Sequence, residues 1–239
     1  MKRFLFIIVF SFVVLASCQK DELTLPAKVI FEFGMYSAYH DSETKNYQYN
    51  PNESSPYFLI ESGVLIVDAI EFDGRREEGQ DFYFISVFPE PVVAILSDLT
   101  TNFDVEFDIP QGVYKKIDIV FHLSNIDRIP LILEGVFKAG NIEKKIRFEH
   151  NYSEKITIKA SNKQQGQNNI ILRKDKLSSA LTIVDADLIF RFISVGQIMN
   201  AETTYINEIP NIIINNQHNT DIYNSIAPRI QNSLKVVFE

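Results

Sequence analysis

Acidic side chains are the most frequent groups in this 239-residue sequence that could do chemistry, with 31 Asp and Glu residues. Two carboxylates held about 5–10 Å apart are enough for glycoside hydrolysis, one as the acid and one as the base or nucleophile. Glu61 and Asp68, or Glu71 and Asp73, are pairs that could face one cleft. Because acidic residues at alternate strand positions usually form a solvated face, these pairs support only an alternative interpretation, an enzyme or enzyme subunit that acts on extracellular polysaccharide.

Other catalytic and metal-binding patterns are absent from the sequence. The four histidines, His40, His122, His150 and His218, form no His-x-x-x-His pair and no His-Glu-x-x-His motif. No nucleophile elbow, phosphate-binding loop or dinucleotide fingerprint is present. We therefore expect no catalytic residue, no metal site and no cofactor.

The only cysteine, Cys18, ends a segment with the composition of a secretory signal peptide. Lys2 and Arg3 supply the basic start, and the uncharged, largely apolar run 4–16 is too short to span a bilayer comfortably. A single thiol also excludes an intrachain disulfide and a Cys-rich zinc site. The sequence thus predicts a signal peptide over residues 1–17.

The segment Leu15-Ala16-Ser17-Cys18 closely resembles the lipobox of bacterial lipoproteins. The resemblance implies that residues 1–17 are removed and that Cys18 becomes the mature N-terminus, with palmitate and further acyl chains that hold the protein on a membrane. Loss of the two basic residues of the signal would leave 21 basic against 31 acidic residues, a net charge of −10. This charge argues against a nucleic-acid partner.

The residues after Cys18 are Gln19, Lys20, Asp21 and Glu22, which resemble the charged export tag of surface lipoproteins in the Bacteroidota. The resemblance implies an outer-membrane lipoprotein exposed at the cell surface, with residues 18–27 as a lipidated tether. An outer-membrane lipoprotein that faces the periplasm is the alternative, because charged residues also form ordinary solvated tethers. Retention in the plasma membrane is disfavoured, since position 19 lacks the Asp that marks it in other lineages.

Residues 36–57 hold five of the ten tyrosines among Asn, Ser, Asp and Glu. They are Tyr36, Tyr39, Tyr47, Tyr49 and Tyr57. Tyrosine beside small polar residues supplies flat amphipathic area for recognition at low entropic cost, so these five are candidate ligand-binding residues for a surface protein or glycan. The alternative, favoured on general grounds, is a strand-connecting loop whose tyrosines pack back onto the domain.

From residue 28 onward, short β-branched and alternating segments are separated by Gly, Pro, Asn and Asp. The predicted strands cover residues 29–33, 63–72, 82–88, 92–96, 103–109, 113–123, 131–138, 142–149 and 155–160. Segments 108–112 (DIPQG) and 139–141 (AGN) have the composition of tight turns, the second between paired strands. Tyr114 and Ile117 are out of phase by one residue, which indicates a bulge or a strand start near Lys116. This spacing is typical of an antiparallel β-sandwich, with residues 28–160 as its core.

The C-terminal third has a different character. Residues 161–169 (SNKQQGQNN) contain no apolar residue and are predicted to form a linker or long loop. The pattern then predicts a helix over 185–200 capped by Asp185 or Asp187, a short strand over 212–214, a second helix from Asn219 or Thr220 that Pro228 kinks or shortens, and a last strand over 234–238. We expect one or two helices in an α+β segment, 161–239, that packs on the same domain.

Three segments carry a second resemblance: 63–72 (GVLIVDAIEF), 107–114 (FDIPQGVY) and 133–137 (LEGVF). They are similar to uncharacterised lipoproteins whose domain is an Ig-like or prealbumin-like β-sandwich. The resemblance spans about residues 28–160, and its motifs are turns and core positions. It implies a mainly β, Ig-like or prealbumin-like fold and an envelope location, but no catalytic residue.

These observations predict a lipid-anchored, non-enzymatic envelope lipoprotein that contributes to binding or assembly at the outer-membrane surface. A minority alternative is a pilus-type adhesin subunit that polymerises by strand exchange. That function requires an open groove or a removable edge strand, and segments 29–33 and 234–238 are the strands to inspect.

Overall fold

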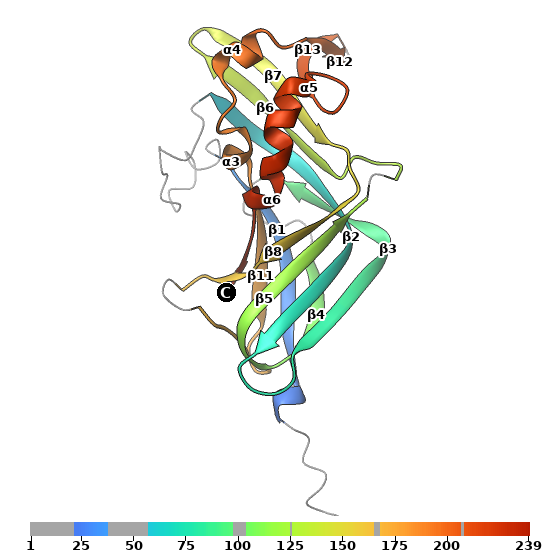
Figure 1. The fold of residues 1–239 in the computed structure, drawn as a ribbon, viewed down its shortest axis with the longest axis vertical. Coiled ribbons are helices and arrows are strands. Elements are labelled where there is room, and N and C mark those ends of the chain that lie inside the picture. Colours follow the sequence, from blue (N-terminus) through green and yellow to red (C-terminus); the bar gives the residue numbers. More distant parts are fainter. Residues whose placement is uncertain (1–21, 38–56, 98–103, 125, 165–167, 207) are drawn as a thin grey trace, which may run out of the picture.

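The computed structural model describes residues 22–37, 57–97, 104–124, 126–164, 168–206 and 208–239. Within these residues the chain forms a five-stranded sheet, in the order β4-β1-β11-β14-β9, and a larger curled sheet, in the order β10-β5-β2-β6-β7-β13-β12 with β3 beside β2 and β8 beside β5 (Figure 1). Most neighbouring strands are antiparallel, and the pairs β1–β11, β13–β7 and β14–β9 are parallel. The predicted mainly β sandwich is confirmed.

The described residues form the following helices and strands. In order they are η1 (Glu22–Thr24), β1 (Pro26–Tyr36), β2 (Phe58–Arg76), β3 (Phe82–Leu96), β4 (Asp104–Pro110), β5 (Gly112–Leu123), β6 (Leu131–Ala139), β7 (Ile142–His150), β8 (Glu154–Lys159), β9 (Ser161–Asn162), β10 (Ile170–Leu172), β11 (Ser178–Asp185), α3 (Ala186–Phe190), α4 (Val195–Met199), β12 (Thr204–Ile206), β13 (Ile209–Ile214), α5 (Thr220–Ile226), η2 (Ala227–Arg229), α6 (Ile230–Ser233) and β14 (Leu234–Phe238).

Strand β2 is long enough to join two halves of the larger sheet. It pairs with β3 over 63–74, with β5 over 69–76 and with β6 over 58–65. Because a strand has only two edges and the β3 pairing overlaps both of the others, β5 and β6 share the opposite edge of β2. Register shifts after Ile60 and after Val67 mark bulges, which bend a strand and increase its twist. The sheet therefore curls between its two halves.

The two halves of this sheet are covered by different elements. The five-stranded sheet packs on one half, where Phe33 of β1 lies 5.7 Å from Phe121 of β5 between ring centroids. Helices cover the other half, where Phe190 of α3 stacks on Phe58 at 5.0 Å. All four of these rings are buried, and each buried Phe stabilises the fold by about 1.5–3 kcal/mol.

Three local predictions in the first 160 residues are confirmed. Strand β5 begins at Gly112 directly after Pro110 and Gln111, and Gly112 has a φ of 151°, which glycine adopts readily. Tyr114 and Lys116 pair with consecutive β2 residues, so the expected bulge lies at Lys115. Strands β6 and β7 form a hairpin in which Ala139 faces Ile142.

Two predicted segments of the C-terminal third differ from the structure. The single helix expected over 185–200 is two short helices, α3 and α4, because Ser194 starts a new helix with a capping box to Gln197. Phe192, placed on the apolar face by the helical spacing, is instead 63% exposed. The loop expected over 161–169 is shorter, since Ser161 and Asn162 form β9 alongside β14.

The predicted second helix and last strand are present. The α-helix α5 ends at Ile226, and Pro228 lies in the 3₁₀ turn that follows, as its ring geometry favours. Asp185 caps α3 by accepting a hydrogen bond from the Leu188 N–H at 3.0 Å. Asn219 occupies the N-cap position of α5 without a side-chain cap; its side chain binds the backbone of Glu202 and Ile213 instead.

Among the described residues, no helix has the length and apolar character needed to cross a membrane.

Candidate functional site

The tyrosine-rich segment begins and ends at one place on the fold. Tyr36 is the last residue of β1, and the Ser37 hydroxyl donates a buried hydrogen bond to the Ile60 carbonyl on β2 at 2.6 Å. Tyr57 precedes β2, is 39% exposed, and lies 6.2 Å from the Phe137 ring. Tyr39, Tyr47 and Tyr49 lie outside the described residues.

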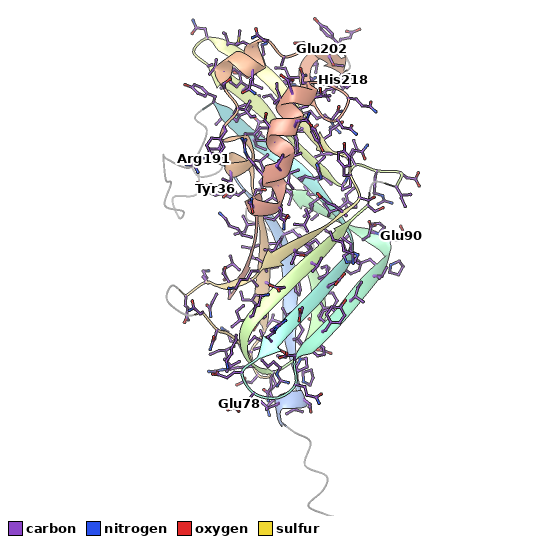
Figure 2. The ribbon with its side chains drawn as sticks, viewed as in Figure 1. Tyr36, Glu78, Glu90, Arg191, Glu202 and His218 are labelled. Atoms are coloured by element: carbon purple, nitrogen blue, oxygen red, sulfur yellow. The ribbon has the colours of Figure 1, made fainter. Side chains whose placement is uncertain are left out.

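The lipidation and export residues are likewise mostly outside the described part of the chain. Cys18, Gln19, Lys20 and Asp21 precede it, and Glu22 opens η1. The described structure begins at one end of the long axis, close to the β2–β3 hairpin that carries Glu78 (Figure 2).

Arg76 fixes this end of the molecule. Its Nη2 donates hydrogen bonds to the Leu23 carbonyl at 2.7 Å and to the Gln111 carbonyl at 2.8 Å. The Gln111 N–H in turn donates to the Leu25 carbonyl at 2.8 Å. A pocket beside Arg76, lined by Gln80, Asp81 and Pro110 among others, has a volume of about 480 Å³. Through the two bonds of Nη2, Arg76 holds η1 and the start of β1 against the larger sheet, while its buried Nε has no hydrogen-bond partner among the described residues.

Glu71 is the centre of a polar cluster on the outer face of the larger sheet. Its carboxylate accepts hydrogen bonds from Lys155 Nζ at 2.8 Å and from the Tyr83 hydroxyl at 3.0 Å, and it contacts His122 Nε2. The four residues come from β2, β8, β3 and β5, and the sheet pairing brings them together. Lys155 in particular, with help from His122 and Tyr83, lowers the pKa of Glu71 to about 2 despite its partial burial.

This cluster weakens the carboxylate-pair hypothesis. Glu71 and Asp73 are two residues apart on β2, so they lie about 7 Å apart along one face. A general acid needs a pKa raised toward neutrality, whereas Glu71 is held ionised by its partners. Glu61 and Asp68 lie seven residues apart on the same strand, about 20 Å or more, which exceeds the spacing that glycoside hydrolysis requires.

A second polar group is buried between β7 and α5. His150 Nδ1 and the Tyr223 hydroxyl are 2.8 Å apart, and His150 Nε2 lies 2.6 Å from Glu154 Oε1. The Tyr223 ring stacks on His150 and Tyr152. Burial raises the pKa of the Tyr223 hydroxyl, and Tyr152 and Glu154 add to the shift. Because His150 and Tyr223 are both buried, this group fixes α5 to the sheet.

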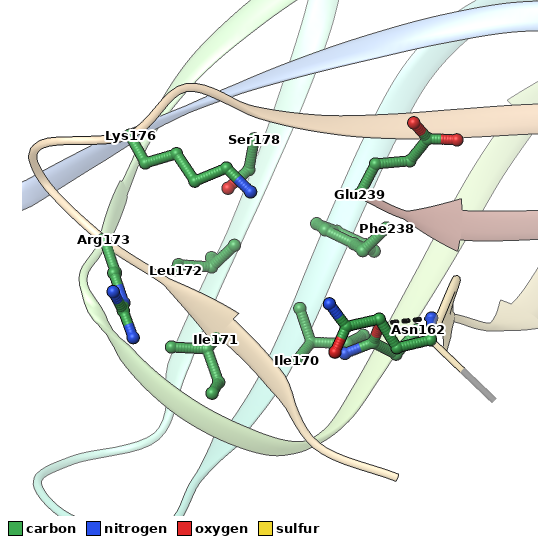
Figure 3. Close-up of a pocket in the computed structure, with 10 residues that line it drawn as sticks. Asn162, Ile170, Ile171, Leu172, Arg173, Lys176, Ser178, Phe238 and Glu239 are labelled. Carbon is green, nitrogen blue, oxygen red and sulfur yellow. Dashed lines mark hydrogen bonds between the residues drawn. The ribbon is translucent and has the colours of Figure 1, made fainter. Parts of the chain in front are cut away.

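A pocket of about 330 Å³ opens where β10 of the larger sheet faces β9, β11 and β14 of the smaller one (Figure 3). Its floor is formed by Ile170, Leu172 and Phe238, which are all buried. Arg173 and Lys176, in the connection between β10 and β11, lie at its rim. No sequence pattern predicts this site, because its residues are spread from 162 to 239 and only the strand pairing brings them together.

Neither segment considered for strand exchange, 29–33 in β1 or 234–238 in β14, has two unpaired edges. β1 pairs with β11 over 29–36 and with β4 over 26–32. β14 pairs with β11 along its length and with β9 at its last two residues. Among the described strands, β3 pairs only with β2 and β4 only with β1. Exposed apolar side chains do follow one face of β3: Tyr83, Ile85, Val87, Val93 and Ile95.

Within the described residues, no group of three or more His, Cys, Asp and Glu side chains has the arrangement of a metal site. No protein-family model, curated protein or solved structure matches the chain.

Proposed function

We propose that the protein is a lipid-anchored lipoprotein of the outer membrane that works as a binding or assembly module, without catalysis, at the cell surface. The observation that carries the proposal is the position of the only cysteine, at the end of Leu15-Ala16-Ser17-Cys18 behind a signal-like apolar run. Once acylated, Cys18 supplies the membrane attachment that the described helices do not.

The geometry of the N-terminal end supports a short attachment. β1 begins at Pro26, so residues 19–25 are the only chain between Cys18 and the sandwich. Seven extended residues span at most roughly 25 Å, and η1 shortens that reach because 3₁₀ turns rise only about 2 Å per residue. Arg76 then fixes Leu23 to the sheet. The domain is thereby held close to the bilayer, with the β2–β3 hairpin on the near side.

Binding rather than catalysis is supported by the two polar clusters around Glu71 and His150. Glu71, His150 and Tyr223 each have their polar atoms engaged by neighbouring side chains. The segment between Tyr36 and Tyr57 is the candidate contact, since it leaves and returns at adjacent points of β1 and β2. Glycan-array or pull-down binding that survives replacement of Tyr39, Tyr47 and Tyr49 by Ala would remove this segment from consideration.

Metabolic labelling tests the lipid attachment. We expect labelled palmitate to be incorporated into the parental chain and into Ser11→Ala, which changes the apolar run but not the lipobox, and not into Cys18→Ser. Whole-cell protease treatment should then degrade the parental protein. Incorporation into Cys18→Ser would contradict the lipoprotein assignment, and full protection from protease would contradict exposure at the surface.

A further inference from the structure

We infer that the pocket between β10 and β14 binds a small amphiphilic anion, an alkyl or acyl chain that ends in a carboxylate or a phosphate. The inference rests on the pocket's own geometry and does not depend on the lipid anchor. Its volume of about 330 Å³ falls at the lower end of the range of ligand sites in proteins, about 300–1,000 Å³.

The floor of the pocket is apolar and already excluded from water. Ile170, Leu172 and Phe238 are each less than 5% exposed. Ile170 and Leu172 come from β10 at the edge of the larger sheet, and Phe238 comes from β14 of the smaller sheet, so the floor lies between the two sheets. Ile171, which also lines the pocket, is an exposed large apolar side chain. A hydrocarbon chain on this floor would remove the exposed Ile171 side chain from water and contact the buried apolar side chains beneath it.

The rim supplies positive charge that is not neutralised within the described residues. Neither Arg173 nor Lys176 forms an ion pair there. The carboxylate of Glu239, which also lines the pocket, is already paired with Lys163 Nζ at 2.7 Å. Figure 3 shows the Lys176 side chain extending over the pocket toward Ser178, above Leu172. A guanidinium and an ammonium on one side of an apolar floor suit a carboxylate or phosphate head group.

The remaining polar groups of the pocket limit the size of that head group. The Asn162 side chain donates to the Asn169 carbonyl at 2.8 Å and accepts from the Gln164 N–H at 2.9 Å. It therefore closes one side of the pocket and is not available as a further ligand. Arg173, Lys176 and the Ser178 hydroxyl are therefore the groups that remain to bind the anion.

Calorimetric titration of the full-length chain carrying Cys18→Ser tests the inference. The probes are octanoate, octyl phosphate, octanol and inorganic phosphate. We expect the two amphiphilic anions to bind at least about tenfold more tightly than octanol or inorganic phosphate, since only they combine a charge-assisted contact with apolar burial. Arg173→Gln/Lys176→Gln should lose that preference.

Lys174→Gln is the matched control, because Lys174 lies in the same turn but does not line the pocket. All three positions are exposed, so the fold of each variant is checked by its thermal unfolding. Equal binding of octanol and octanoate, unchanged binding by the double variant, or an equal loss in Lys174→Gln would each overturn the inference.

Sedimentation with vesicles distinguishes the two sources of such a ligand. Retention on phosphatidylglycerol but not phosphatidylcholine vesicles, lost in the double variant, would identify a membrane lipid. Tight binding of free octanoate or octyl phosphate without vesicle retention would identify a soluble amphiphile. Absence of both would overturn the inference.

Discussion

At the scale of single residues, sheet pairing surrounds Glu71 with hydrogen-bond partners. Its carboxylate is a group of the type that can act in catalysis, but here it is bound by neighbouring side chains. Its carboxylate is 14% exposed and meets Lys155, His122 and Tyr83 from three neighbouring strands. A carboxylate with this many partners is stabilised as the anion. The charge therefore contributes to folding rather than to proton transfer.

The stability of the protein should depend on pH through this residue. Because the pKa of Glu71 in the folded protein is about 2, below its ordinary value of 4.5, the ionised carboxylate stabilises the fold fully above about pH 4.5. That contribution is lost as the pH falls toward 2. Glu71→Gln should reduce the change in unfolding free energy between about pH 4.5 and pH 2 by about 1–2 kcal/mol. This value is reduced from the full pKa shift because solvent screens the exposed Lys155 partner.

Urea denaturation between pH 2 and pH 7 measures the effect. Glu90→Gln is the control, because Glu90 is exposed on β3 and makes no ion pair within the described residues. Superimposable pH profiles for Glu71→Gln and the parental chain would show that Glu71 does not supply the acid dependence.

At the scale of elements, the junction of β2 and β6 depends on a close approach of two backbones. Gly135 on β6 faces Ile60, at the point where the β2 register shifts. A Cβ placed on Gly135 would lie 2.1 Å from the Leu59 carbonyl oxygen and 2.7 Å from the Ile60 Cα. Neither backbone atom can move without breaking the pairing that joins the two halves of the sheet.

Gly135→Ala is therefore expected to destabilise the fold by about 3 kcal/mol or more. Gly140→Ala, in the β6–β7 turn, has open space around the new Cβ but a φ of 60°, and should cost about 1–2 kcal/mol. Chemical denaturation compares the two variants. A smaller loss for Gly135→Ala than for Gly140→Ala would contradict the close-packing argument.

The strands of the first 160 residues were predictable because apolar residues alternate and Gly and Pro separate them. β11 was not, since its buried face includes Ser178 and Thr182 beside Ala180. These small polar residues hide the apolar pattern of a central strand. The helix predicted over 185–200 was too long. Phe192 fits a helical spacing, but Ser194 starts a new helix. The pocket was not predictable, because Leu172 and Phe238 become neighbours only through the sheet order.

At the scale of the whole molecule, the two ends of the long axis differ in their distance from the proposed anchor. Glu78 lies at the end where the described chain begins, and Glu202 lies at the opposite end (Figure 2). Both are exposed. Since acylation consumes the only natural thiol, a second cysteine would be the single site for a thiol-reactive label.

Fluorescence quenching by labelled lipid head groups tests this orientation. A fluorophore on Glu78→Cys in the lipidated protein should be quenched more strongly than one on Glu202→Cys, because the tether reaches only about 25 Å. Without lipidation, in a Cys18→Ser background, the difference should disappear. Stronger quenching at position 202 would mean that the domain folds back onto the membrane.

The parallel pairing of β1 with β11 also has a consequence for the order of folding. Val29 pairs with Ser178, so β1 cannot complete its pairing until a strand from the last third of the chain is in place. Contacts so distant in sequence slow folding, since a long loop must close before they form. A chain that crosses a membrane N-terminus first thus emerges with β1 able to pair only with β4 until β11 arrives. In the export that we propose, the smaller sheet therefore stays incomplete until the last third of the chain has crossed the membrane.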